Sequence, residues 1–189
     1  MAQSSGTIRD LGTLGGASSG AVAINAFGHV AGDSATAGGS THAFRWTPSV
    51  GMQDLGTLGG ETSVAAGMNA RGQVIGASYT AHGEHRAFRW TASGGMEDIG
   101  TLGGDFTTVG AINNLGQVTG YSRLPNGNNR AFRWTPSHGI QDLVLSAAPA
   151  VPQGRSTIWD RSPGSPIPLT AHPTHSAGRP PEGCKTSAR

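Results

Sequence analysis

The chain has 189 residues, enough for one domain or two small ones, and it is rich in glycine and poor in charge. Glycine takes 31 positions, charged residues make up 13% of the chain, and the formal net charge is +2. No apolar run approaches the roughly 18 residues of a membrane span, and the opening stretch MAQSSGTIRD lacks the apolar segment of a signal peptide. The single cysteine, Cys184, excludes an internal disulfide framework and a cysteine-based zinc site.

Three consecutive copies of one unit make up most of the chain. Asp10, Asp54, Asp98 and Asp142 are spaced 44 residues apart, and the copies that they delimit align without a gap. Of the 44 columns, 19 are identical in all three copies, so the unit is a structural repeat. The copies are residues 10–53, 54–97 and 98–141.

Each copy has the pattern of four short β-strands separated by turns. The first strand is a run of small residues such as 19–25, and it ends at an asparagine that is followed three residues later by a glycine. This spacing predicts a hairpin turn whose last residue has a positive φ, at Gly28, Gly72 and Gly116. The second strand (QVIGAS in the middle copy), a variable loop and the third strand (AFRWT) follow. The fourth strand, MQDLGTL in the first copy, is expected to end at a Gly-Gly pair.

A period of about 40 to 50 residues with four strands is typical of β-propeller blades. We therefore expect an all-β fold, a partial β-propeller of three four-stranded antiparallel blades. Residues 8–11 match a fourth strand, which predicts an orphan N-terminal strand. Large aromatic residues recur in register, and we expect core wedges between neighbouring blades in preference to a sugar-stacking platform. They are Phe44, Trp46, Phe88, Trp90, Phe132 and Trp134.

The two ends of the chain differ from the repeats. Residues 144–189 hold 8 of the 11 prolines and only 4 of the 31 glycines, without strand or helix periodicity, so this tail and residues 1–6 are expected to be disordered. The tail carries a net charge of +3 and residues 1–143 a net charge of −1, so the repeats offer no basic surface for nucleic acid. One hypothesis is that the tail is an out-of-frame reading of a gene whose true frame continues the repeats.

The phrases DLGTLGG, AIN-x-x-G-x-V-x-G-x-S and HAFRW resemble the HAF family of extracellular repeats over about residues 7–143. His42-Ala43-Phe44 keeps the triplet that names the family, whereas Arg86 and Arg130 replace its histidine. The resemblance implies a bacterial protein, secreted or attached to the cell surface, with propeller-like blades and no established common activity. The extracellular location is an implication of the resemblance alone, because this chain shows no export signal.

The repeated polar motifs favour structural roles over catalysis, cofactor binding or metal binding. LGTLGG lacks the helix and the Lys-Ser/Thr pair of a phosphate-binding loop. His82-x-x-His85 lies in a variable loop and His172-x-x-His175 in the tail, and neither offers the scaffold of a metal site. Arginine and aspartate recur nine residues apart across the third turn, and we expect them to pair. The pairs would be Arg45 with Asp54, Arg89 with Asp98 and Arg133 with Asp142.

The variable loop between the second and third strands is the candidate ligand surface, because propellers carry function on the loops of one rim. The loops span residues 35–41, 79–85 and 123–129. Their variation also fits solvent loops under little constraint. The side chains there with binding chemistry are Tyr79, His82, Glu84, His85, Arg123, Asn126 and Asn128.

Two functions remain open from the sequence. The first is a non-catalytic binding or structural module of the bacterial surface or secreted fraction. The alternative is a fragment of a carbohydrate-active or other hydrolytic propeller, in which the non-repeated acids Asp33, Glu61, Glu84 and Asp105 would converge. Three blades are too few to close a ring of the usual 4 to 8, so the open edges predict self-association, such as a six-blade homodimer, or marginal stability.

Overall fold

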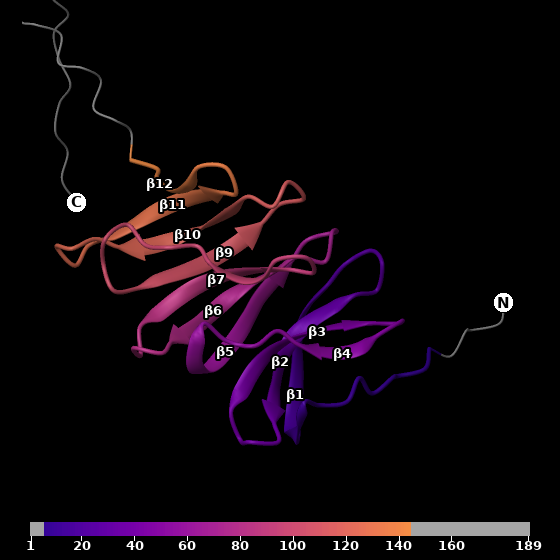
Figure 1. Cartoon of the computed structure of the whole chain (residues 1–189). Coiled ribbons are helices and arrows are strands. Elements are labelled where there is room, and N and C mark those ends of the chain that lie inside the picture. The colour runs from indigo at the N-terminus through magenta and orange to yellow at the C-terminus, as the bar shows by residue number, and fades with distance from the viewer. Residues whose placement is uncertain (1–5, 145–189) are drawn as a thin grey trace, which may run out of the picture. The chain divides into compact units, whose positions relative to one another are not determined.

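The computed structural model describes residues 6–144, which form three four-stranded antiparallel sheets (Figure 1). The all-β class and the three antiparallel four-stranded units expected from the sequence are confirmed. In every sheet the strands lie side by side in chain order. Among these residues there is no helix, and so none that could cross a membrane. The disorder expected for residues 1–5 and for the tail from residue 145 concerns positions outside the described residues.

The strands of the three sheets have similar bounds, except that the first strand of the third sheet is shorter. The first sheet contains β1 (Gly15–Ile24), β2 (Val30–Thr36), β3 (Thr41–Thr47) and β4 (Gly51–Asp54). The second contains β5 (Gly59–Met68), β6 (Val74–Thr80), β7 (His85–Thr91) and β8 (Gly95–Asp98). The third contains β9 (Thr107–Ile112), β10 (Val118–Arg123), β11 (Asn129–Thr135) and β12 (Gly139–Asp142).

The fourth strand is shorter than predicted, because the chain leaves each sheet directly after its aspartate. The Asp54 carboxylate accepts the N–H of Gly56 at 2.8 Å, and Gly56 has a φ of +75° that glycine adopts without steric cost. The first two Gly-Gly pairs, expected to end a fourth strand, instead open a sheet, since β1 starts at Gly15 and β5 at Gly59, whereas β9 starts only at Thr107, after the third pair.

The expected orphan N-terminal strand is wrong. Residues 6–13 belong to no strand, and Ile8 is fully exposed. A strand needs a hydrogen-bonding neighbour, and the described residues place none beside this segment. Leu11 and Leu14 nevertheless pack against the core residues of the first sheet.

An asparagine closes each hairpin between the first and second strands. The Asn25 side-chain oxygen accepts the N–H groups of Phe27 and His29, at 3.0 and 3.1 Å. Asn69 and Asn113 form the equivalent pairs of bonds in their own hairpins. The glycines that follow have positive φ values of +71°, +72° and +77° at Gly28, Gly72 and Gly116.

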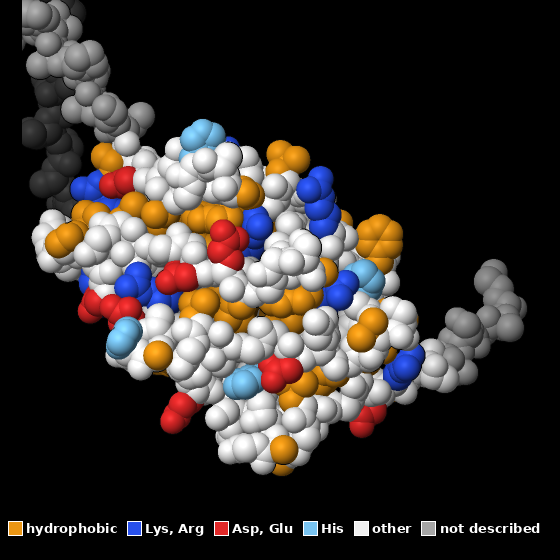
Figure 2. Space-filling view, viewed as in Figure 1, with side chains coloured by type: hydrophobic (Ala, Val, Ile, Leu, Met, Phe, Trp, Pro, Cys, Tyr) orange, Lys and Arg blue, Asp and Glu red, His pale blue; other side chains and the backbone are white. Residues whose placement is uncertain are grey.

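Most of the core lies in two seams, the first between the first and second sheets and the second between the second and third sheets (Figure 2). A third cluster of buried residues lies on the first sheet and consists of Val30, Phe44 and Trp46. In the first seam, Val74, Phe88 and Trp90 pack against the small residues Ala31 and Ala43 of the first sheet. The second seam repeats this arrangement with Val118, Phe132 and Trp134. Large side chains of each later sheet therefore pack against the facing side chains of the sheet before it, which are small at the first seam.

Each sheet presents its first strand to the sheet before it. β5 lies across β2 and β3, and β9 lies across β6 and β7. The approach of the first and second strands within a sheet is close, since a Cβ added to Gly76 would lie 2.0 Å from the Val64 carbonyl oxygen. A side chain at this column would therefore push the strands apart, which explains why Gly32 and Gly120 occupy it in the other two sheets.

Candidate functional site

The repeated aspartates form turns and do not pair with the repeated arginines. The ladder places Phe44 opposite Asp54 and Arg45 opposite Gln53, so the arginine and the aspartate point to opposite faces of the sheet. Asp54 instead contacts the His42 Nδ1 atom at 2.8 Å, and Asp142 contacts Arg130 at 3.6 Å. The predicted Arg–Asp pairing is therefore wrong by one residue of register.

Two of the three repeated arginines, Arg45 and Arg89, reach across the seams to tryptophans. The Arg45 guanidinium lies 5.7 Å from the Trp90 ring centroid, and that of Arg89 lies 4.8 Å from the Trp134 ring centroid. Burial lowers the pKa of Arg45, which stays charged at physiological pH. These two stacked pairs join neighbouring sheets, so Arg45 and Arg89 have a structural role.

Of the four non-repeated acids, Glu84 and Asp105 line one depression, whereas Asp33 and Glu61 lie elsewhere. Asp33 accepts the Ala65 N–H across the first seam, and burial raises its pKa although this hydrogen bond opposes the shift. Glu84 pairs with Arg86 at 3.0 Å, and Asp105 pairs with Arg123 at 3.1 Å. Within residues 6–144, no three histidine, cysteine or acidic side chains gather as a metal site would require.

The residues that we singled out in the loops lie partly in strands. Tyr79 belongs to β6, His85 to β7 and Arg123 to β10, so the turns themselves are shorter than the predicted loops. His82 lies in the turn after β6, where its N–H donates to the Thr80 hydroxyl at 3.3 Å. In the third sheet, Asn126 accepts the Asn128 N–H at 3.1 Å.

A row of aromatic rings connects the second and third sheets at this end of the strands. Tyr79 meets the edge of His85 at 5.6 Å between ring centroids, and His85 stacks on Phe106 at 4.6 Å. Phe106 in turn faces Tyr121 at 5.9 Å. We call these four residues the aromatic row. Its two ends are open to solvent, with Tyr79 45% and Tyr121 44% exposed.

Phe106 and Tyr121 were missed at the sequence level. Both interrupt the repeat, because Thr62 stands in the column of Phe106 and Ala77 in the column of Tyr121. A non-repeated aromatic residue inside a repeated frame was therefore the signal that could have identified them. Their partners Tyr79 and His85 were among the predicted residues, and the structure brings these two together.

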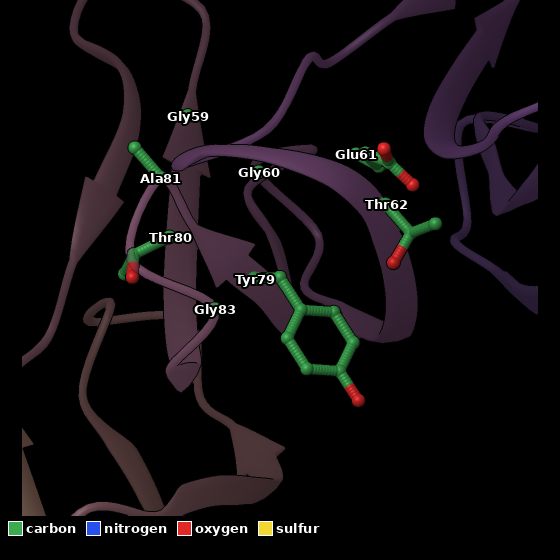
Figure 3. A pocket seen from close by; sticks show the side chains of 8 residues that line it. All are labelled: Gly59, Gly60, Glu61, Thr62, Tyr79, Thr80, Ala81 and Gly83. Carbon is green, nitrogen blue, oxygen red and sulfur yellow. The ribbon is translucent and has the colours of Figure 1, made fainter.

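A depression of about 230 Å³ lies at the aromatic row and is lined in part by Tyr79 and His85. Two shallower depressions lie beside it. One, of about 540 Å³, is lined by Tyr79, Glu61 and Thr62 and otherwise by glycines and small residues (Figure 3). The other, of about 610 Å³, contains Glu84, Arg86, Asp105 and Arg123, so carboxylates and guanidiniums alternate along it. The Arg123 guanidinium also lies 5.4 Å from the Phe106 ring centroid. Together the row and its borders offer ring faces beside hydrogen-bonding groups of both charges.

No known protein family matches the sequence, and no curated protein shows significant similarity to it. Function must therefore be inferred from the side chains themselves.

Proposed function

We propose that the chain is a non-catalytic binding or structural repeat module of the HAF type, with propeller-like blades, which acts in the bacterial secreted or surface fraction. The observation that carries the proposal is the division of labour between repeated and non-repeated side chains. The repeated aspartates serve turns and two of the three repeated arginines serve seams, whereas the aromatic row, whose two ends are exposed, is built from residues that interrupt the repeat. This division fits a scaffold that presents one specialised surface.

The strand arrangement supports the propeller-like part of the proposal. β5 contacts β1 and β9 contacts β5, so the first strands of successive sheets approach one another. Convergence of equivalent strands toward a common side is how blades surround an axis.

The chemistry of the aromatic row favours a polar ligand that contains rings, and we take saccharides as this class. Exposed tyrosine faces offer apolar contact, and Glu61, Glu84 and Arg123 lie close enough to the row to share a ligand's hydroxyl groups. The depressions are shallow, which suits a ligand that lies along the surface more than one that is enclosed.

Titration of the full chain with cello-, chito- and malto-oligosaccharides, followed by NMR shifts of the tyrosine rings, tests this function. We expect one series to bind, and the substitutions Tyr79→Ala and Tyr121→Ala each to weaken it about tenfold, the scale of one lost ring contact of about 1.4 kcal/mol. Phe27→Ala is the matched control, since Phe27 is an exposed aromatic residue of the first sheet outside the row. Release of reducing ends from the bound series would contradict a non-catalytic role.

A further inference from the structure

Neighbouring sheets are joined by the same contacts at both seams. Asn25 Nδ2 donates across the first seam to the Asn69 carbonyl at 3.2 Å, and Asn69 Nδ2 donates across the second seam to the Asn113 carbonyl at 2.9 Å. The arginine-on-tryptophan stacks recur in the same way. Each sheet thus has an exit face, which supplies the asparagine, the arginine and small side chains, and an entry face, which supplies the tryptophan and the carbonyl.

The exit face of the third sheet is uncovered within residues 6–144. Ala131 and Thr119 are exposed there, whereas Ala87 and Ile75, in the same columns of the second sheet, are fully buried. Arg133 is exposed and stacks on no described tryptophan. The face also carries a largely apolar depression of about 320 Å³, lined by residues that include Ala111, Thr119, Arg133 and Leu143.

The entry face of the first sheet is incompletely covered. Ile24 is 72% exposed, whereas Met68 and Ile112, in the same column, are partly buried against the preceding sheet. The Asn25 carbonyl accepts only the Gly28 N–H among the described groups, whereas the Asn69 carbonyl accepts both the Gly72 N–H and the Asn25 side chain. An apolar depression of about 370 Å³ lies along this face beside Val22 and Ile24.

We propose that the exit face of the third sheet docks on the entry face of the first sheet of a second copy of this chain, head to tail. The docking reproduces the two seams, with Asn113 Nδ2 donating to the Asn25 carbonyl and the Arg133 guanidinium stacking on the Trp46 ring. Such an interface is heterologous, and it closes into a ring or extends into a filament according to the rotation between copies.

A second copy fits this face better than the chain's own residues 145–189. At each of the two seams, the exit face is covered by a valine, a phenylalanine and a tryptophan of the following sheet. The phenylalanine and the tryptophan belong to the AFRWT phrase. Residues 145–189 contain no phenylalanine and one tryptophan, Trp159, outside any such phrase. The first sheet of a second copy carries AFRWT at residues 43–47.

Docking requires one local displacement. Arg9 now lies 5.0 Å from the Trp46 ring centroid, and Leu11 stands in the column that Leu143 occupies at the end of the third sheet. The incoming Arg133 and Leu143 would therefore replace the segment that contains Arg9 and Leu11. That segment forms no strand and leaves Ile8 fully exposed, so it can move aside without breaking a sheet.

Cysteine crosslinking between two differently labelled chains tests the pairing. At the second seam the Ala70 N–H bonds to the Asn114 side chain at 2.9 Å, and the corresponding contact between copies joins Asn114 of one to Ala26 of the other. We would prepare Ala26→Cys and Asn114→Cys as separate full chains, each with Cys184→Ser. The mixture should form a disulfide-linked dimer, and neither variant alone should do so. Equal crosslinking of either variant with itself would overturn the head-to-tail arrangement.

Sedimentation of the full chain over a wide concentration range provides the second measurement. We expect association that Ala131→Arg weakens at least tenfold, because the arginine would enter a face that is closed in the complex. Ser93→Arg, in the exposed turn of the second sheet, is the matched control and should associate like the unchanged chain. A chain that remains monomeric at every concentration would overturn the proposal, and saccharide binding by that monomer would leave the proposed function intact.

Discussion

The second and third sheets have the same columns of residues but different surroundings. Ala87 in the second sheet is fully buried because the third sheet covers it, whereas Ala131 in the same column of the third sheet is exposed. The residue is identical, so burial in this fold is set by the neighbouring sheet and not by the strand itself. Equal substitutions in equivalent columns should therefore have unequal effects.

The largest contrast is expected for a charge placed in this alanine column. Ala87→Arg would bury a cation without a partner and overfill the second seam, at a cost of about 3 kcal/mol or more, enough to unfold a marginal domain. Ala131→Arg should change the free energy of unfolding by less than about 0.5 kcal/mol in dilute solution. Urea denaturation followed by circular dichroism measures both. Similar losses for the two variants would show that the third sheet's exit face is covered by something else.

The hairpin asparagines should show a smaller contrast. Asn69→Ala removes the turn bonds and the bond across the second seam, whereas Asn113→Ala removes only the turn bonds described for it. The difference between the two losses should be about 1 kcal/mol, the net value of one hydrogen bond. It is measured by the same urea titrations at low protein concentration. Equal losses would mean that the bond across the seam contributes nothing to stability.

The stacked arginines should show a contrast of similar or smaller size. Arg89→Ala removes the contact with Trp134 and a 3.5 Å ion pair with Glu97, and it should cost about 1 kcal/mol. Arg133→Ala should cost almost nothing in dilute solution. Arg71→Ala, at an exposed position of the second hairpin, controls for the general loss of a cation. A stability loss for Arg133→Ala as large as that for Arg89→Ala would contradict the comparison.

The smallest expected effect is a pH dependence of stability that arises at the first seam and has no equivalent at the second. Burial raises the pKa of Asp33, whose column holds Ala77 at the second seam. The folded chain therefore binds this proton more tightly than the unfolded chain, and this contribution to stability is lost as the pH rises through the folded pKa. Asp33→Asn should be the more stable form near neutral pH, and its advantage should shrink as the pH falls toward the pKa of an exposed aspartate.

Melting temperatures measured across the acidic range test this dependence. Asp105→Asn is the matched control, because the Asp105 carboxylate is 74% exposed and its charge costs little to keep in the folded state. An advantage of Asp33→Asn that grew as the pH fell would contradict the direction of the shift.

The arrangement of strands and turns could be predicted from the sequence because it depends on local rules. Asparagine and glycine at fixed spacing specify the hairpins, and alternation in AFRWT specifies a strand with two different faces. The ends of the fourth strands could not be predicted in this way. They depend on the bond from the Asp54 side chain to the Gly56 N–H, which competes with continued strand pairing.

The repeated phenylalanines and tryptophans could be predicted as wedges between sheets, but the polar and the non-repeated contacts between sheets could not. The prediction that Arg45 pairs with Asp54 assumed a register that differs by one residue from the ladder, and such a slip moves a side chain to the opposite face. The aromatic row was found only in part, because Phe106 meets His85 through packing between sheets that no local pattern encodes. The invariant Asn column was noticed as a strand end, but its bonds across the seams were not predicted.

The short segment that connects one sheet to the next limits how such a chain can lengthen. The Leu55 N–H is bonded to the Ala43 carbonyl of the first sheet at 3.0 Å, and the Leu58 N–H is bonded to the Ser78 hydroxyl of the second sheet at 2.9 Å. The few residues between are thus anchored at both ends. An insertion or deletion here would break one anchor, whereas duplication of a whole 44-residue copy recreates both. Gene duplication in complete copies is therefore the route by which this architecture grows without damaging its joints.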